Sequence, residues 1–142
     1  VYERAHTRQI AEISGLANQM PIIAFFLAFA GFASLGLPGL SGFVGEFLSL
    51  LGAWEATGLW NGFALLAGFG VLFGAAYILW LLRRTVFGQP SMAVADAGDA
   101  KALDWAVLVP LAALILAMGL YWDLLLKFVD PAATALAKVL GQ

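Results

Sequence analysis

The sequence predicts an all-α integral membrane protein, and three observations lead to this fold class. Hydrophobic residues make up 63% of the 142-residue chain and charged residues 11%, and the mean hydropathy is +0.93. A soluble domain usually contains about 25% charged residues. The apolar residues also form long runs separated by short polar stretches, as in helices that cross a bilayer. We therefore expect three transmembrane spans and a C-terminal amphipathic helix.

Composition also excludes several kinds of site. The chain has no cysteine, which excludes disulfides and thiolate metal sites, and a single histidine argues against a histidine-based metal site. The net charge of −2 is small, and nothing in the sequence indicates nucleic-acid binding. The polar start Val1-Tyr2-Glu3-Arg4 does not have the pattern of a signal peptide. Because the first residue is not Met, we expect a fragment or a processed product.

The first span is predicted at residues 21–53, after a polar cytoplasmic loop at residues 1–20. Between Pro21 and Trp54 the only ionisable residue is Glu46. A continuous helix of this length would measure about 48 Å, whereas the hydrocarbon core of a bilayer is about 30 Å thick. The span must therefore tilt strongly or be interrupted.

The interruption is predicted at residues 37–42, which read Leu-Pro-Gly-Leu-Ser-Gly. Pro38 removes a backbone donor and clashes with the preceding turn, while Gly39 and Gly42 relax the backbone dihedrals. Ser41 is predicted to cap the second half-helix. The freed backbone groups cannot face lipid, so the break is expected to be buried in protein or to line a wet cavity.

The second span is predicted at residues 61–82, after a periplasmic loop at residues 54–60. This loop contains two tryptophans, which suit the headgroup level of a membrane. The span contains Gly70-Val71-Leu72-Phe73-Gly74, a GxxxG pattern that lets another helix approach closely. We favour ordinary close packing inside one bundle over a dimer interface.

The third span is predicted at residues 105–122, after a second cytoplasmic loop at residues 83–104 that is rich in Gly, Pro and Asp. Asp104 is expected to cap the start of this span, and Pro110 to bend it.

A periplasmic tail is predicted at residues 123–142. Asp130-Pro131 is a helix-start signal. Apolar residues then recur at three- and four-residue spacing up to Gly141, which predicts a short amphipathic helix on the membrane surface or against a partner.

Basic residues set the predicted orientation. Five Lys and Arg residues lie in the two loops assigned to the cytoplasmic side, and two lie on the opposite side: Arg4, Arg8, Arg83, Arg84 and Lys101 against Lys127 and Lys138. The N-terminal loop is therefore expected on the cytoplasmic side, or the matrix side of a mitochondrion.

Glu46 is the predicted site of proton transfer. A carboxylate at membrane depth costs a few kcal/mol, so it is retained where it faces the bundle interior and has a use. The alternative is that Glu46 lies nearer the interface or braces the helix break through a hydrogen bond. No Lys, Arg or His accompanies it in the spans, so a proton path needs water or segments outside this chain. His6, in the first loop, is expected to cap or brace that loop rather than to admit protons.

Several stretches of the chain resemble one membrane protein family. They are Tyr2–Arg8, Gly15–Ala17, Met20–Pro21, Leu37–Phe47, Arg83–Gly88 and Met118–Tyr121. The Leu-Pro-Gly run followed by Gly45-Glu46-Phe47 is specific, and the other stretches support it. Together they resemble the C-terminal part of the M-type subunit (chain 4) of proton-pumping NADH:quinone oxidoreductase, respiratory complex I, which is an antiporter-like subunit.

The resemblance implies the last three of about fourteen helices, with a discontinuous twelfth helix. It implies a membrane-arm subunit that couples electron transfer from NADH to quinone to proton pumping, with Glu46 as the proton-carrying residue. Glutamate at this position is typical of the M-type subunit, whereas the sister subunits and Mrp-type Na⁺/H⁺ antiporters typically have lysine. An Mrp-type subunit and a purely structural assembly subunit remain as alternatives.

The same resemblance implies the surroundings of the chain. FMN, iron–sulfur clusters and quinone are expected on partner subunits, with no cofactor and no metal on this chain. The expected partners are other membrane-arm subunits, including the sister antiporter-like subunits, and the lipid bilayer. The expected location is the bacterial inner membrane or an equivalent energy-transducing membrane. Since the preceding helices are missing, this chain alone is not expected to move protons.

Overall fold

The fold is a bundle of long helices. It is seen in a computed structural model, which describes residues 1–56 and 60–139. The five long helices are α3 (Pro21–Ser34), α4 (Ser41–Glu55), α5 (Gly62–Thr85), α6 (Ala102–Leu120) and α7 (Trp122–Val139). Three short helical turns precede them: α1 (Tyr2–Ala5), η1 (Ile10–Glu12) and α2 (Leu16–Gln19). Helices are the only regular secondary structure in the described ranges, so the predicted all-α class is confirmed.

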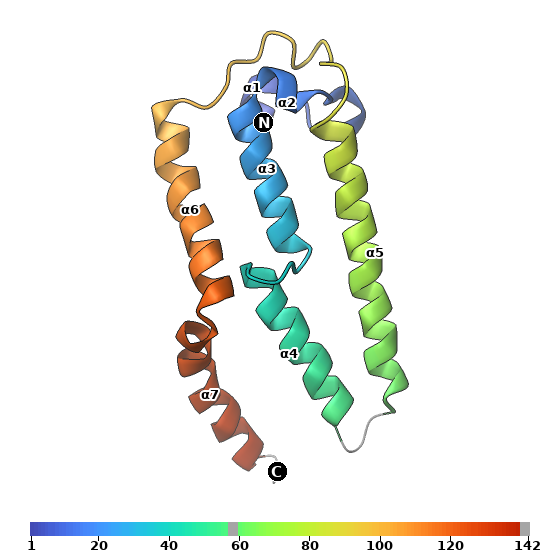
Figure 1. Ribbon diagram of the computed structural model, residues 1–142, viewed down its shortest axis with the longest axis vertical. Helices are drawn as coiled ribbons and strands as arrows, with labels where there is room; N and C mark the ends of the chain where they lie inside the picture. The colour runs from blue at the N-terminus through green and yellow to red at the C-terminus, as the bar shows by residue number, and fades with distance from the viewer. Residues whose placement is uncertain (57–59, 140–142) are drawn as a thin grey trace.

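The helices form three parallel columns (Figure 1). The middle column consists of α3 and α4, which follow one another end to end. On one side, α5 is a single helix that contacts both α3 and α4. On the other side, α6 contacts both halves of the middle column, and α7 continues beyond α6. The N-terminus and the loop between α5 and α6 lie at one end of the bundle, and the C-terminal end of α7 lies at the other.

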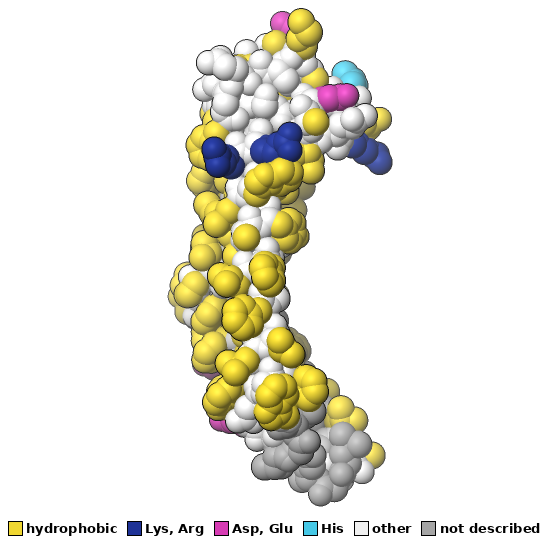
Figure 2. Space-filling model, turned by 90° about the vertical axis from the view of Figure 1, so that its right-hand side faces the viewer, with side chains coloured by type: hydrophobic (Ala, Val, Ile, Leu, Met, Phe, Trp, Pro, Cys, Tyr) yellow, Lys and Arg dark blue, Asp and Glu magenta, His cyan; other side chains and the backbone are white. Residues whose placement is uncertain are grey.

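Among the residues that the structure describes, two helices, α5 and α6, are long and apolar enough to cross a membrane by length and composition. The apolar α3 has 14 residues and α4 has 15, which correspond to about 21 and about 23 Å. Each is shorter than the bilayer core of about 30 Å. Figure 2 shows hydrophobic side chains along the length of the α5 side of the molecule, with Lys and Arg gathered near one end.

The break between α3 and α4 covers residues 35–40, two residues earlier at each end than the predicted 37–42. The reason is Gly36, whose φ of 65° is left-handed and ends α3 before Pro38 is reached. The amide of Gly36 donates to Ala33 O at 3.3 Å, and the amide of Leu37 donates to Phe32 O at 3.4 Å. These two hydrogen bonds form a Schellman motif, which satisfies carbonyls at the helix end.

The starts of α6 and α7 also correct the sequence prediction. The helix α6 begins at Ala102, and Asp104 stabilises it from inside the first turn by accepting a hydrogen bond from the Lys101 amide at 2.6 Å. The helix α7 begins at Trp122 and contains Pro131 in its interior, so the predicted start at Asp130-Pro131 is wrong. Trp122 is anchored by a hydrogen bond from Nε1 to Gly119 O at 2.7 Å, which allows the helix to begin earlier. The predicted end at Gly141 lies outside the described residues.

The best-buried side chains lie at the end of the bundle that carries the N-terminus. Leu16, Met20 and Val94 are fully buried there, in a cluster that also includes Ile78 and Leu82 of α5. The polar loop expected at residues 1–20 is therefore a packed segment with short helices. Hydrogen bonds join it to the segment after α5, including Ala17 N to Val86 O at 2.9 Å and Ser14 Oγ to Gln89 O at 2.8 Å.

Candidate functional site

Glu46 lies in the second turn of α4, just beyond the helix break, and its side chain is half-buried. Its carboxylate rests directly against the backbone of Gly36, on the other side of the break. A methyl group at Gly36 would overlap Glu46 Oε2 and would lie 2.8 Å from Cδ. The absence of a side chain at Gly36 therefore leaves the space that the carboxylate occupies.

The residues predicted to form the helix break have different structural roles. Gly39 has a φ of 91°, a left-handed conformation that favours glycine. Gly42, in the first turn of α4, packs so closely on the end of α3 that a Cβ there would overlap Ala33 O. Pro38 lies exposed in the turn between the two helices.

Ser41 does not cap α4, which corrects the sequence prediction. The capping position belongs to Leu40, whose backbone is extended, with φ −113° and ψ 156°, and α4 has no side-chain cap hydrogen bond. A capping hydroxyl acts from the residue that precedes the first helical residue. Ser41 is already that first helical residue, so it lies one position too late.

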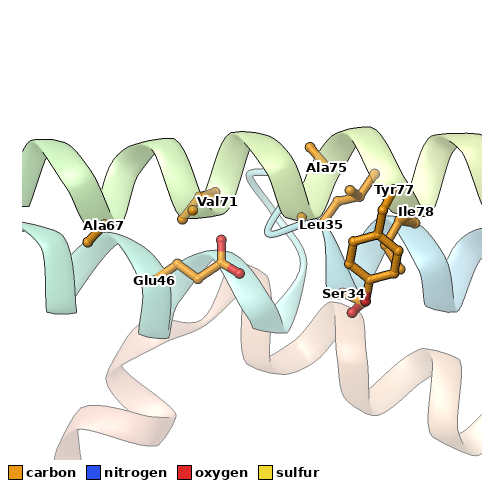
Figure 3. Close-up of a pocket in the computed structure, with 10 residues that line it drawn as sticks. Ser34, Leu35, Glu46, Ala67, Val71, Ala75, Tyr77 and Ile78 are labelled. Carbon is orange, nitrogen blue, oxygen red and sulfur yellow. The ribbon is translucent and has the colours of Figure 1, made fainter.

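A recess of about 400 Å³ adjoins Glu46. It is lined by the end of α3 (Ser34 and Leu35), by Glu46, and by a largely small-residue face of α5 that includes Gly70 and Gly74. Figure 3 shows the Glu46 side chain between α4 and α5, near Val71, with Ser34 and Tyr77 farther along the recess. The polar side chains on its wall are thus one carboxylate and two hydroxyls.

The GxxxG glycines of α5 do not mediate a close helix contact within the described part of the chain. A Cβ added at Gly70 or at Gly74 would find no other atom within 4 Å. These glycines instead widen the recess on the side that faces Glu46. The expectation of close packing inside a bundle is therefore not met by the helices described here.

Glu46 makes no side-chain hydrogen bond and no ion pair with any residue in the described ranges. The alternative, in which Glu46 stabilises the helix break through a hydrogen bond, is therefore not supported by any hydrogen bond in the described ranges. The carboxylate contacts the break by packing alone and faces the recess. Its oxygens therefore border the recess without a hydrogen-bond partner among the described residues.

His6 lies outside this site, at the C-terminal end of α1. It is exposed, has a left-handed φ of 54°, and its amide donates to Tyr2 O at 2.8 Å. This geometry is that of a helix cap, in keeping with the expected structural role. No three His, Asp or Glu side chains of the described segments lie close enough together to hold a metal ion.

Asp99 is a structural residue that the sequence reasoning missed. Its carboxylate accepts hydrogen bonds from the amides of Ile22 at 3.0 Å and Ile23 at 3.2 Å, so it caps the start of α3 from the loop before α6. Desolvation acts to raise the pKa of Asp99, but the amides of Ile22, Ala100 and Ile23 and the charge of Arg4 together lower it. A signal was present, because Met20-Pro21 starts a helix without a Ser, Thr, Asn or Asp before it.

Arg4 extends this connection to α6. Its guanidinium donates to the carbonyls of Gly98 and Asp99 and forms an ion pair with Asp104. The N-terminal segment, the loop after α5 and the first turn of α6 are thus joined at one cluster. Through Asp99, the same cluster holds the start of α3, the helix whose far end borders Glu46.

Comparison with known proteins identifies the family. Residues 1–74 match the family model described as NADH:quinone oxidoreductase/Mrp antiporter, TM. NADH-quinone oxidoreductase subunit M of Rhodobacter capsulatus is 42% identical over 139 residues, which cover 97% of this chain and 27% of the relative. NADH-ubiquinone oxidoreductase chain 4 of Chondrus crispus is 40% identical over 122 residues, which cover 85% of this chain and 24% of the relative.

A solved structure agrees with these relatives. A chain of respiratory complex I from Thermus thermophilus with bound NADH superimposes with a TM-score of 0.84 at 36% identity, covering 99% of this chain and 29% of that chain. The present chain therefore spans about a quarter of the length of the curated relatives described above. The names of these relatives confirm the predicted resemblance to M-type subunits.

The family and the apolar helices α5 and α6 agree on location: the chain is integral to an energy-transducing membrane. On the match over residues 1–74, the chain belongs to the NADH:quinone oxidoreductase/Mrp antiporter membrane family.

Proposed function

We propose that this chain is the C-terminal part of a proton-translocating membrane-arm subunit of NADH:quinone oxidoreductase, in which Glu46 carries protons. The observation that carries the proposal is the position of Glu46. It is the only ionisable residue between Pro21 and Trp54, it follows a helix break, and it borders a recess of about 400 Å³. Ionisable residues beside broken membrane helices mark ion pathways in transport proteins.

The topology that we propose has three spans. The first consists of α3 and α4 with the break between them, and the others are α5 and α6. This assignment is supported by helix length, because α3 and α4 are each too short to cross alone. The N-terminal end of the bundle then lies on the cytoplasmic side, with residues 1–20 and 83–104, and α7 belongs to a periplasmic tail.

The proposed proton step involves the carboxyl group of Glu46 alone among the ionisable groups of this span. One carboxylate oxygen takes a proton from a donor in the recess, and the carboxylic acid later releases it to an acceptor. A recess of about 400 Å³ has room for on the order of ten water molecules at about 30 Å³ each. The hydroxyls of Ser34 and Tyr77 provide hydrogen-bonding groups on its wall.

The remaining parts of a complete pump belong to the rest of the subunit and its partners. We propose that other membrane-arm subunits, including the sister antiporter-like subunits, surround this chain. FMN, the iron–sulfur clusters and quinone are proposed to lie on partner subunits. The whole complex would then couple electron transfer from NADH to quinone to proton movement, with no redox chemistry on this chain.

An Mrp-type Na⁺/H⁺ antiporter subunit is the second candidate, because the matched family description names both kinds of protein. Glutamate at position 46 favours the oxidoreductase, as does the resemblance to M-type subunits. The two candidates differ in one measurable property. Proton movement depends on NADH oxidation in the oxidoreductase and on a Na⁺ gradient in the antiporter.

The test is Glu46→Gln in the intact complex, with Glu55→Gln at the exposed end of the same helix as the matched control. Proton uptake into inverted vesicles and the quinone reductase rate are both measured with NADH, and a native gel checks assembly. We expect Glu46→Gln to lower both activities while Glu55→Gln leaves them unchanged. Wild-type activities in an assembled Glu46→Gln complex would show that Glu46 is not a proton station.

A further inference from the structure

The junction between α6 and α7 lies directly against the break between α3 and α4. Gly119, in the last turn of α6, is buried there. A Cβ on Gly119 would overlap the carbonyl oxygen of Gly39 and would lie 2.5 Å from the carbonyl carbons of Gly39 and Leu40. These are backbone atoms, which cannot swing aside as the end of a side chain can. Glycine at position 119 therefore permits the contact between the two columns.

Trp122 makes a second contact at the same junction. Only Tyr121 separates α6 from α7, and Trp122 is the first residue of α7. Its indole ring lies 5.9 Å from the ring of Phe43 and 6.3 Å from that of Phe47, measured between centroids. Its Nε1 donates to Gly119 O at 2.7 Å, which ties the ring to the glycine that touches the break.

Both contacts act on the residues that orient Glu46. Leu40 is the cap residue of α4, and its carbonyl accepts a hydrogen bond from the Phe43 amide at 3.2 Å. Phe43 lies one helical turn before Glu46, and Phe47 is the next residue after it. Gly119 thus contacts the residue that caps α4, and Trp122 packs against residues in the first two turns of α4.

We propose that Gly119 and Trp122 are positioning residues that hold α4 so that the carboxylate of Glu46 faces its recess. Among the described residues, neither Gly119 nor Trp122 forms a hydrogen bond or an ion pair with Glu46. The inference rests on the proposed function only for its consequence in proton transport. The orientation of Glu46 itself can be measured whatever Glu46 does.

The experiment compares Gly119→Ala with Gly52→Ala in the complete complex. Both changes add one methyl group to a helical glycine, but a Cβ at Gly52 meets no atom within 4 Å. The first readout is the rate at which dicyclohexylcarbodiimide, an apolar reagent for protonated carboxyl groups, labels Glu46, measured by peptide mass. The second readout is NADH-driven proton uptake into inverted vesicles.

We expect Gly119→Ala to lower both rates relative to Gly52→Ala, and to lower proton uptake by up to about a hundredfold, because misplacing a reacting group by about 1 Å can cost about two orders of magnitude. Trp122→Ala should act in the same direction, and Trp122→Phe should restore most of the labelling because an aromatic ring still contacts Phe43 and Phe47. Wild-type labelling of Glu46 in Gly119→Ala overturns the proposal.

Two further results have a defined interpretation. If Gly119→Ala does not assemble, the Trp122 pair decides, and equal labelling in Trp122→Ala, Trp122→Phe and wild type overturns the proposal. If labelling falls in Gly119→Ala but Glu46→Gln pumps normally, the positioning role stands and the proposed proton-carrying role of Glu46 fails.

Discussion

Gly36→Ala tests the contact between the helix break and Glu46 most directly. The change adds a single methyl group that would overlap Glu46 Oε2. A carboxylate is the far end of a flexible side chain, so it can rotate away and the fold is retained. The backbone at position 36 has a φ of 65°, and an alanine there costs about 1–2 kcal/mol. The substitution therefore destabilises the chain modestly and displaces the carboxylate.

The magnitude of the functional effect follows from that displacement. The carboxylate must move by about 1 Å or more to clear the methyl group, which corresponds to a loss of about a hundredfold in the rate of a position-sensitive step. The assay is NADH-driven proton uptake by the intact complex in inverted vesicles. The midpoint temperature of complex dissociation is measured in parallel, so that lost stability and lost transport are separated.

Gly88→Ala is the matched control for the backbone strain. Gly88 also has a left-handed φ, of 99°, but a Cβ there meets no atom within 4 Å. The two variants should therefore lose similar stability, while only Gly36→Ala loses proton uptake. If both variants pump at the same rate, the contact between Gly36 and Glu46 has no functional role and the reasoning is refuted.

Three further predictions concern the ends of the helices. Asp99→Ala removes the cap of α3 and should lower the free energy of unfolding by about 1 kcal/mol. The loss is measured as a lower midpoint temperature of complex dissociation. Asp99→Asn keeps one acceptor oxygen and should lower the stability less. Because folding lowers the pKa of Asp99, its ionised carboxylate stabilises the fold at a pH above the ordinary pKa of 3.8, and this stabilisation is lost as the pH falls below 3.8. Asp99→Asn should remove this dependence on acid pH. Gly42→Ala should block assembly, because its methyl group meets Ala33 O, while Ser41→Ala should assemble normally on a native gel.

The membrane class, the helix break and the candidate residue could be predicted from the sequence because they depend on local properties. Long apolar runs are visible in any window of the chain, and Pro38 and Gly39 disfavour a helix wherever they occur. Glu46 stands out because no other ionisable residue lies near it in the sequence. Two single-residue predictions were wrong because a neighbouring residue takes the predicted role. Leu40, not Ser41, is the cap residue of α4, and Gly36 ends α3 before Pro38 is reached.

Only the tertiary structure decided which distant segments complete the site. The cap of α3 comes from Asp99, 77 positions away from Ile22, and the surface against the break comes from Gly119. The helix α7 starts at Trp122, whose ring packs on Phe43 and Phe47 and whose Nε1 donates to Gly119 O, and not at the local signal Asp130-Pro131. Such contacts depend on how the helix columns pack side by side. This packing cannot be predicted from the spacing of residues along the chain.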